Sequence, residues 1–481
     1  MNTKYILSID QGTTSSRVAV LNHEGRIVDM FSHAFDQIIK DDKVLQDAEL
    51  IFSGVKNILD EAILKYGKDN IYSIGITNQR ETTVIFDEDG KPLDYAISWQ
   101  SKHTNDICET WRALGYEPYV KRVTGLPINP YFSASKMAYF LEQKHIKDKM
   151  KKEKVRFGTM DTFLLYRLTG GKSYYTDITN ASRTMLLNID EKDYDEKLLK
   201  LFNIKRSMLP DVKLNQFDFG YYKDIPIKAM IGDQQSALFG HLAFKKGAMK
   251  VTYGTGAFIL MNTGSRIYES KSGLITTIGF SYDNEVTYAV EGSIFVAGAS
   301  VKWLRDQLEI IKTSSESETL ARKSERRMYF VPAFVGLGAP YWDTKVRGAM
   351  FGITADVNKC DIAKATLDAI SFQVKEVVDV MIKETEIPLE EVYIDGGVSD
   401  NGYLMQYQSD LLRCPLIKPF ETEITALGAG FLAGLPGLYP NVEFLRKHKK
   451  IKTSYKPKLS YQEASKDFEG WKRAVRSART Y

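Results

Sequence analysis

The sequence predicts a mixed α/β protein with two domains on either side of a cleft. The chain has 481 residues, and a single hydrophobic core stops growing near roughly 250–300 residues, so two domains are expected. An apolar strand, a turn rich in small and hydroxyl residues and a second apolar strand occur twice, at 5–20 and at 248–264. Strands and helices alternate in the rest of each half, which is typical of an α/β fold.

The repeated hairpin suggests an internal duplication, although two unrelated hairpins would give the same pattern. The second copy begins close to the middle of the chain. We therefore expect the domain boundary near 240–250, with an N-terminal domain over 1–245 and a C-terminal domain over 246–481.

The apolar pattern predicts further elements in each half. Strands are expected at 71–78 and 391–397, the second ending at a glycine pair. Helices are expected at 48–67, 359–384, 401–412, 425–434 and 464–478. The helix at 425–434 should be buried, and the C-terminal helix at 464–478 should dock through one apolar face.

Composition excludes several classes of protein. The formal net charge is +4, with 43% hydrophobic and 26% charged residues, which does not favour nucleic-acid binding. The three cysteines lie far apart and form no CxxC motif, so a zinc site or disulfide framework is not expected and a reducing compartment fits. The start of the chain lacks the apolar core of a signal peptide, and the uncharged stretch 424–442 contains several glycines and two prolines. These features predict a cytoplasmic protein without membrane insertion.

The first turn, "DQGTTSSR", has the residues of a phosphate-binding and metal-binding loop. Gly12 allows a sharp turn, and the backbone N–H groups of such a turn suit phosphate oxygens. Arg17 adds a permanent positive charge, and Asp10 could hold a magnesium ion through water. The turn hydroxyls belong to Thr13, Thr14, Ser15 and Ser16. A solvated surface hairpin is the alternative interpretation.

Three other glycine-containing segments could complete a nucleotide site. The second turn, "YGTGAF", supplies Thr255 for the same purpose as the first. In "DGGVSDN", Gly397 permits close approach of a base or ribose and Asn401 can hydrogen-bond it. Gly298 lies on the expected opposite wall. The sequence contains neither GxxxxGK[ST] nor GxGxxG, so this is neither a Walker loop nor a Rossmann fingerprint.

Two pairs of polar residues follow predicted strands. Arg80 and Glu81 are adjacent, and on an extended chain their side chains point in different directions; they suit a polyhydroxylated substrate, or form a surface charge pair. Asp233 could accept a proton from a hydroxyl that attacks phosphorus, with Gln234 beside it, or it could cap the following helix.

Three aromatic residues could form the wall of a small pocket. They are Trp99, Tyr131 and Phe258. Each of them could equally belong to a hydrophobic core.

Taken in order, these motifs resemble the FGGY carbohydrate kinases of the actin and hexokinase superfamily. The resemblance rests on "DQGTTSSR", "GITNQRETT", "NPYFSASK", "DITNASRTML", "GDQQSALFG", "YGTGAF", "VPAFVGLGAPYWD", "DGG" and "TALGAGFLAGL". It implies two duplicated RNase H-like domains. "NQRETT" with "GDQQ" favours the members that phosphorylate glycerol over those that act on pentuloses. The implied reaction is ATP-dependent and Mg²⁺-dependent formation of sn-glycerol 3-phosphate, and the family suggests a homo-oligomer, a dimer or tetramer.

The resemblance also implies roles for single residues. Asp233 would be the general base. The residues that would bind glycerol are Arg80, Glu81, Trp99, Tyr131, Asp233, Gln234 and Phe258. The residues that would bind the nucleotide are Thr13, Thr14, Ser15, Arg17, Thr255, Gly298, Gly397 and Asn401, with Asp10 serving the metal.

The sequence departs from the family pattern at several positions. Lys302 stands where the best-known relatives have glutamine near the nucleotide. The segment 41–50 replaces the usual Gly-Trp-Val-Glu-His-Asp run. The segment 215–230 lacks both the loop that binds fructose bisphosphate and the phosphorylated histidine segment of some relatives, so neither control is expected here. A pentulose kinase, an ATPase acting as chaperone or filament subunit, and a catalytically dead sensor are the rival hypotheses.

Overall fold

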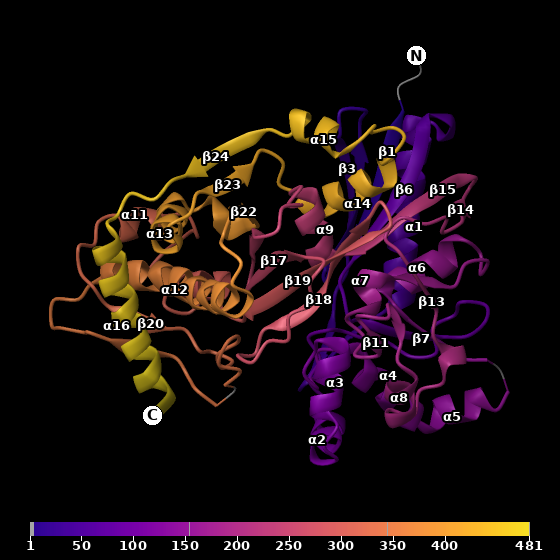
Figure 1. Ribbon diagram of the computed structural model, residues 1–481, viewed down its shortest axis with the longest axis horizontal. Coiled ribbons are helices and arrows are strands. Elements are labelled where there is room, and N and C mark those ends of the chain that lie inside the picture. The colour runs from indigo at the N-terminus through magenta and orange to yellow at the C-terminus, as the bar shows by residue number, and fades with distance from the viewer. Residues whose placement is uncertain (1–3, 153, 344, 481) are drawn as a thin grey trace.

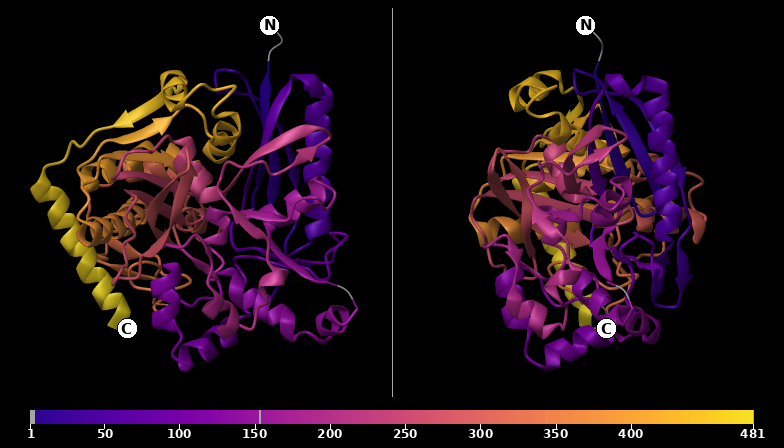
Figure 2. Two further views of the ribbon diagram at one scale, coloured as in Figure 1. Left: turned by 45° about the vertical axis from the view of Figure 1, so that its right-hand side comes forward. Right: turned by 90° about the vertical axis from the view of Figure 1, so that its right-hand side faces the viewer.

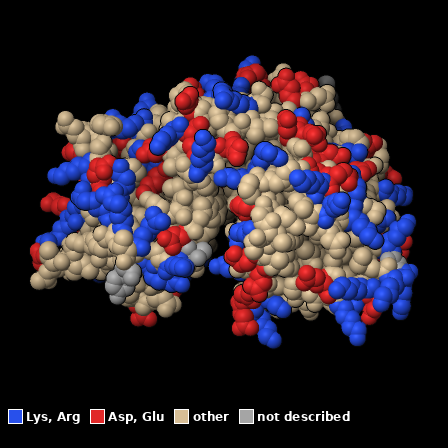
Figure 3. All heavy atoms as spheres, turned by 60° about the horizontal axis from the view of Figure 1, so that its bottom comes forward, with Lys and Arg blue, Asp and Glu red and all other residues tan. Residues whose placement is uncertain are grey.

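The computed structural model describes residues 4–152, 154–343 and 345–480. The chain forms two lobes, the earlier half of the sequence on the right of Figure 1 and the later half on the left. A space-filling view shows the surface hollowed between the lobes (Figure 3). The expectation of a cleft between two halves is therefore confirmed.

A six-stranded sheet forms the centre of the first lobe, in the order β14-β15-β6-β1-β2-β3. Strands β1, β2 and β3 form an antiparallel meander, and β6 and β15 add to β1 in parallel. The bounds are β1 Tyr5–Gln11, β2 Ser15–Leu21, β3 Ile27–Ala34, β6 Ile71–Asn78, β14 Tyr221–Tyr222 and β15 Ile225–Gly232.

A seven-stranded sheet forms the centre of the second lobe, in the order β18-β19-β17-β16-β22-β23-β24. The bounds are β16 Ala248–Tyr253, β17 Ala257–Gly264, β18 Ile275–Tyr282, β19 Glu285–Ile294, β22 Glu391–Asp395, β23 Leu416–Pro419 and β24 Ile451–Tyr455. Strands β16, β17 and β19 pair antiparallel in that order, with β18 on the outer edge of β19, and β22 and β23 continue from β16 in parallel. The run β19-β17-β16-β22-β23 thus repeats β3-β2-β1-β6-β15, which confirms the internal duplication.

Helices cover both faces of each sheet, as the views in Figure 2 show. Helices α1 (Ala48–Tyr66) and α6 (Met160–Leu168) pack on one face of the first sheet, and α12 (Lys359–Thr385) and α13 (Gly402–Leu412) pack on the second. Local signals explain where these helices begin: the Asp47 carboxylate accepts two N–H groups at the start of α1, and Asn358 and Asp361 form a capping box on α12.

Two central helices, α9 (Asp233–Gly240) and α14 (Ile424–Gly434), lie between the sheets and pack on each other. Helix α9 follows β15 and helix α14 follows β23, the corresponding parallel strands of the two repeats. Ser236 Oγ donates to the Thr425 carbonyl at 2.7 Å, and Gly428 is so close to α9 that an added Cβ would lie 1.9 Å from the Ser236 carbonyl oxygen. Helix α14 also packs on β1 and β6 of the first lobe. The predicted buried helix at 425–434 is therefore confirmed, and within the described residues no helix has the length and apolar composition needed to cross a bilayer.

A five-stranded sheet and a group of helices extend the first lobe. The sheet order is β4-β5-β8-β7-β9. Its bounds are β4 Ile38–Lys40, β5 Lys43–Gln46, β7 Thr83–Phe86, β8 Ala96–Ile97 and β9 Arg156–Thr159. The helices packed with it are α2 Asn105–Ala113, α3 Glu117–Thr124, α4 Ser133–Glu142, α5 Lys144–Met150 and α8 Glu196–Leu201.

The remaining elements are short or lie at the periphery. Among these, helix α16 buries Phe468, Trp471 and Val475 against the second lobe, which confirms the predicted docking of a C-terminal helix. The bounds are β10 Tyr175–Asp177, α7 Ile178–Ala181, β11 Leu187–Asn188, β12 Asp193–Tyr194, β13 Asp211–Lys213, α10 Gly298–Asp306, α11 Glu316–Ala321, β20 Tyr329–Val331, β21 Ala349–Phe351, α15 Val442–His448 and α16 Tyr461–Thr480.

Candidate active site

The two glycine-containing turns lie between the first two strands of each repeat. In the first turn, the Gly12 N–H donates to the Ser15 carbonyl at 2.9 Å, Thr14 is exposed and Thr13 is half-buried. In the second, the Gly254 N–H donates to the Gly256 carbonyl at 2.9 Å. Both turns are tight and leave hydroxyl side chains at the surface, as a phosphate-binding role requires.

An aromatic group connects the two turns across the cleft. The Trp99 indole N–H donates to Thr13 Oγ1 of the first turn at 3.0 Å. The Trp99 ring meets Phe258, three residues beyond Thr255, edge-on with centroids 6.3 Å apart, and it meets Tyr131 edge-on at 5.7 Å. The structure therefore brings the three predicted aromatic residues together as one wall, and it places the turns of both repeats near that wall.

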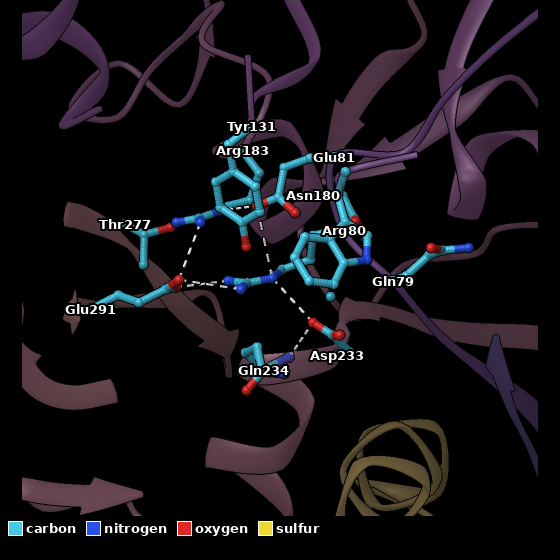
Figure 4. Close-up of polar contacts among 12 residues, drawn as sticks. Gln79, Arg80, Glu81, Tyr131, Asn180, Arg183, Asp233, Gln234, Thr277 and Glu291 are labelled. Atoms are coloured by element: carbon cyan, nitrogen blue, oxygen red, sulfur yellow. Dashed lines mark hydrogen bonds and ion pairs between the residues drawn. The ribbon is translucent and has the colours of Figure 1, made fainter. Parts of the chain in front are cut away.

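A buried polar cluster lies next to the aromatic wall (Figure 4). Arg80 Nε lies 3.0 Å from Asp233 Oδ1, and the two terminal nitrogens of Arg80 lie 2.8 and 3.3 Å from the Glu291 carboxylate. Arg183 Nε lies 2.6 Å from Glu81 Oε1, and its Nη2 lies 3.2 Å from Glu291 Oε1. The side chains of Arg80, Glu81, Arg183 and Glu291 are all at most 2% exposed, whereas Asp233 is 29% exposed. Asp233 is therefore the member of the cluster that opens toward the cleft.

The backbone at Glu81 corrects one premise of the sequence interpretation. An extended chain would turn the side chains of Arg80 and Glu81 apart, but Glu81 is left-handed, with φ of 61°. Arg80 Nε consequently lies 4.0 Å from Glu81 Oε1, and both side chains reach the same cluster. Such backbone conformations are costly for a residue with a side chain and persist where the surrounding structure fixes them.

Burial and pairing set the charges in the cluster. Burial favours the neutral form of Glu291, but Arg183 and Arg80 together outweigh it and lower the pKa of Glu291 to about 2. Burial raises the pKa of Glu81 despite Arg183 and Arg80. Burial also raises the pKa of the Tyr131 hydroxyl, with the Glu81 charge adding to the effect. Of the two buried glutamates, Glu291 is thus the more firmly ionised.

Helix α9 begins with Asp233 itself. Gly232 occupies the capping position, and Asp233 Oδ1 accepts the N–H of Gln234 at 2.6 Å. The alternative of a simple helix cap therefore does not describe Asp233, because the residue is the first of the helix and also binds Arg80. Gln234 accepts a hydrogen bond from the buried Lys250 ammonium, whose pKa burial lowers to about 8.

Asp10 ends β1 beside the first turn, and its neighbours suit a cation. Burial first, and then the Asp233 charge, raise the pKa of Asp10 to about 7, with Arg17 opposing. Two nearby carboxylates supply the hard oxygen ligands that Mg²⁺ prefers. Among the described residues, no three acidic, histidine or cysteine side chains are grouped closely enough to hold a metal ion. The residues therefore fit a magnesium ion that keeps waters and phosphate oxygens among its ligands. Arg17 itself pairs with Glu423 at 2.5 Å.

The predicted nucleotide residues of the second half lie around the second turn. The Gly298 N–H donates to the Gly254 carbonyl at 3.0 Å, and an added Cβ on Gly298 would lie 2.6 Å from that oxygen. Gly396, with φ of 85°, approaches the Tyr253 backbone equally closely, while no atom lies within 4 Å of the Cβ position of Gly397. Gly397 thus faces open space.

Asn401 is committed to local structure. Its side chain accepts the Leu404 N–H at 2.9 Å as the cap of α13 and donates to Ser317 Oγ at 3.3 Å. The contacts of the Asn401 side chain are therefore with α11 and α13.

Three residues of the site were not singled out by sequence reasoning. Arg183 lies inside the quoted motif "DITNASRTML". Glu291 is the buried one of the two carboxylates of strand β19, in an otherwise apolar stretch. Lys136 is buried, and its ammonium donates to the carbonyls of three consecutive residues, 130–132, at 2.9, 2.6 and 3.1 Å. It fixes the loop that carries Tyr131.

The fold and this site together define a kinase of the sugar and polyol type: a duplicated α/β core, glycine-containing turns from both repeats and a buried polar cluster between the lobes. The chain matches the FGGY family of carbohydrate kinases, N-terminal domain, over residues 5–240, and the C-terminal domain of that family over residues 249–435. The chain belongs to the FGGY family of carbohydrate kinases.

Several proteins that are similar to this chain over nearly its full length are glycerol kinases. The chain is 44% identical to the glycerol kinase of Lactococcus lactis subsp. lactis, over 100% of this chain and 99% of that protein. It is 45% identical to the glycerol kinase of Limosilactobacillus reuteri, over 99% of each. Among solved structures, Plasmodium falciparum glycerol kinase with ADP matches with a TM-score of 0.94 at 36% identity, over 99% of this chain and 98% of that one. The xylulose kinase of Lactobacillus acidophilus has the same fold, with a TM-score of 0.88 at 23% identity over 98% of each chain.

Proposed function

We propose that this chain catalyses the ATP-dependent phosphorylation of glycerol to sn-glycerol 3-phosphate. The observation that carries the proposal is the pocket in which Asp233, paired with Arg80, opens toward the cleft beside the aromatic wall of Trp99, Tyr131 and Phe258. The full-length similarity to glycerol kinases supports glycerol as the substrate.

We assign the polyol site and the first phosphate turn to an N-terminal domain, residues 1–245, and the nucleotide to a C-terminal domain, residues 246–481. The polyol hydroxyls bind Arg80, Glu81, Tyr131 and Gln234, and the carbon chain packs on Trp99 and Phe258. The nucleotide and its phosphates bind the two turns and their neighbours: Thr13, Thr14, Ser15, Arg17, Thr255, Gly298, Gly397 and Asn401.

Asp233 accepts the proton of the attacking hydroxyl in this proposal. Its contacts to Arg80 Nε and to the Gln234 N–H both use Oδ1, so we assign the proton to Oδ2. The Arg80 contact orients the carboxylate. A positioned base of this kind contributes on the order of 10²–10⁴-fold.

Magnesium, held near Asp10, would neutralise phosphate charge when bound. The residues of the chain do the positioning: the two turns present N–H and hydroxyl donors to phosphate, and the aromatic wall excludes water from the carbon chain. Most of the rate of phosphoryl transfer comes from such positioning and electrostatic stabilisation. Because water is also a nucleophile, the two lobes must close mainly when polyol is bound.

Two finer assignments belong to the same proposal. The chain works in the cytoplasm, which fits its three free cysteines, Cys108, Cys360 and Cys414. It forms a homo-oligomer, a dimer or tetramer, as the family resemblance implies. Light scattering on the purified protein tests the second assignment.

A panel of polyols tests the substrate. The value of kcat/KM with ATP and Mg²⁺ is measured for glycerol, xylulose, ribulose and erythritol. We expect glycerol to exceed the others by at least about 10²-fold, because a wrong hydroxyl pattern leaves buried donors unpaired. A pentulose as the best substrate, or ATP hydrolysis that no polyol accelerates, would contradict the proposal.

A further inference from the structure

Glu291 lies in β19 of the second lobe, yet its carboxylate contacts two arginines from the first half of the chain. Arg80 follows β6, and Arg183 follows the short helix α7. The Glu291 side chain is 0% exposed, and its oxygens lie 2.8 Å from Arg80 Nη1 and 3.2 Å from Arg183 Nη2. A carboxylate from one lobe therefore holds two cations of the other.

The five charged groups form a chain of alternating sign: Asp233, Arg80, Glu291, Arg183 and Glu81. Dashed lines in Figure 4 join Glu291 to both Arg80 and Arg183, Arg80 to Asp233, and Arg183 to Glu81. The two ends are acids that the proposed function places against the polyol. The side chain of Glu291, at the centre, is fully buried, as is that of Arg183.

The geometry of Arg80 depends on Glu291. Both terminal nitrogens of Arg80 face the Glu291 carboxylate, which leaves Nε for Asp233. Paired contacts of this kind fix the plane of a guanidinium. Without the negative charge of Glu291, Arg80 would be drawn to the remaining acids, Asp233 at 3.0 Å and Glu81 at 4.0 Å.

The same reasoning applies to Arg183, which lies between Glu291 and Glu81. Its guanidinium also lies over the Tyr131 ring, 5.6 Å from the centroid. A shift of Arg183 would therefore move Glu81 and disturb Tyr131 together.

Stability alone gives little reason for this arrangement. Taking the four buried charged groups out of water costs several kcal/mol for each ion, and well-packed apolar residues often replace buried ion pairs without loss of stability. The charges are more simply explained by what they orient.

We propose that Glu291 is a positioning residue for polyol recognition: from the second lobe it sets the orientation of Arg80 and Arg183, and through them of Asp233 and Glu81. This inference rests on the proposed function of the pocket. It assigns to β19 a part in binding the polyol, in addition to its place in the sheet.

The test compares Glu291→Gln, which keeps the shape and removes the charge, with the matched control Asp368→Asn. Asp368 is likewise a buried carboxylate paired with an arginine, Arg327, at 2.5 Å, and it lies on α12, outside the polyol pocket. For E291Q we expect the KM for glycerol to rise by about 10–100-fold, with the KM for ATP changed by less than about 3-fold. For D368N we expect loss of thermal stability with an unchanged KM for glycerol.

A conservative variant supplies a second readout. Glu291→Asp keeps the charge, and we expect it to recover part of the affinity for glycerol that E291Q loses. If E291Q does not fold, Arg183→Lys takes its place, because a lysine keeps the charge but cannot contact two carboxylates as a guanidinium does. The same selective rise in the KM for glycerol is expected.

A wild-type KM for glycerol in E291Q, or in R183K if E291Q does not fold, would overturn the inference. An equal rise in the KM values for glycerol and for ATP would also overturn it. Failure of the proposed function is seen separately, in the wild type. If the wild type phosphorylates another polyol instead, that polyol replaces glycerol in the comparison and the test of Glu291 is unchanged.

Discussion

Arg80 Nε lies 3.0 Å from Asp233 Oδ1, which joins a fully buried guanidinium to a carboxylate that opens into the cleft. The contact fixes one oxygen of Asp233 and leaves the other for substrate. Arg80 is in turn fixed by Glu291. The chemistry proposed for Asp233 therefore depends on residues from both lobes.

Replacing Asp233 with asparagine tests its role as the base. Asp233→Asn keeps the shape of the side chain but removes its ability to accept a proton, so we expect kcat to fall by at least about 10²-fold. The thermal shift produced by ADP with Mg²⁺ should remain, because the nucleotide binds elsewhere. Near-normal turnover in this variant would remove Asp233 from the role of base.

Truncating Trp99 tests the aromatic wall. Trp99→Ala removes the ring that meets Tyr131 and Phe258 and the donor to Thr13. We expect the KM for glycerol to rise by about 10-fold or more, since burial of a large apolar side chain is worth about 1.5–3 kcal/mol. Trp99→Phe, which keeps a ring and loses only the N–H, should have a smaller effect. Equal KM values in both variants and the wild type would show that the ring does not contact the polyol.

The close contact of the two central helices predicts a strong effect at Gly428. In Gly428→Ala the new Cβ would lie 1.9 Å from the Ser236 carbonyl oxygen, so the helices must separate. We expect a loss of stability of about 1–3 kcal/mol in chemical denaturation. Gly397→Ala is the control for stability, because nothing lies within 4 Å of its Cβ position. The prediction fails if the two variants unfold at the same denaturant concentration.

Glu376 predicts a pH dependence of stability. It is buried on α12, its Oε1 accepts the Tyr341 hydroxyl, and burial raises its pKa from 4.5 to about 7. Between these values the folded state holds a proton that the unfolded state has lost, so this group's contribution to stability falls as pH rises from about 4.5 to about 7.

The variant Glu376→Gln, which stays neutral, measures this contribution. Its stability relative to the wild type should increase with pH across that window, by at most about 1.4 kcal/mol per pH unit. Denaturation at about pH 5 and about pH 8 gives the comparison, with Glu61→Gln on the exposed face of α1 as the control. A difference between wild type and E376Q that is the same at both pH values would contradict the shift.

Sequence patterns predicted the regular elements well where local signals were strong. The helices at 48–67 and 359–384 have clear apolar stripes and side-chain caps. The repeated turn predicted the duplication that the strand order confirms. Helix α14 was expected as buried, but its packing on the first lobe depends on contacts with β1 and β6, far apart in the sequence.

The site was only partly predictable for the same reason. The three aromatic residues were predicted from their types, and Arg80 and Asp233 were each predicted from a position after a strand, but not their contact with each other. Glu291 was missed because an acid within an apolar stretch gives no sign of its partners, which lie 211 and 108 residues away in the sequence. The left-handed backbone of Glu81 gave no signal either, because the residue is not a glycine.

Phosphorus NMR of one reaction mixture tests the central claim most directly, namely that groups from both lobes transfer phosphate from ATP to a three-carbon alcohol. The wild-type protein is incubated with ATP, Mg²⁺ and glycerol, in parallel with D233N. We predict that the γ-phosphate signal is replaced by a single phosphomonoester on a terminal carbon of glycerol, in the wild type alone. Inorganic phosphate as the only new signal, or the same ester formed equally fast by D233N, would contradict the account.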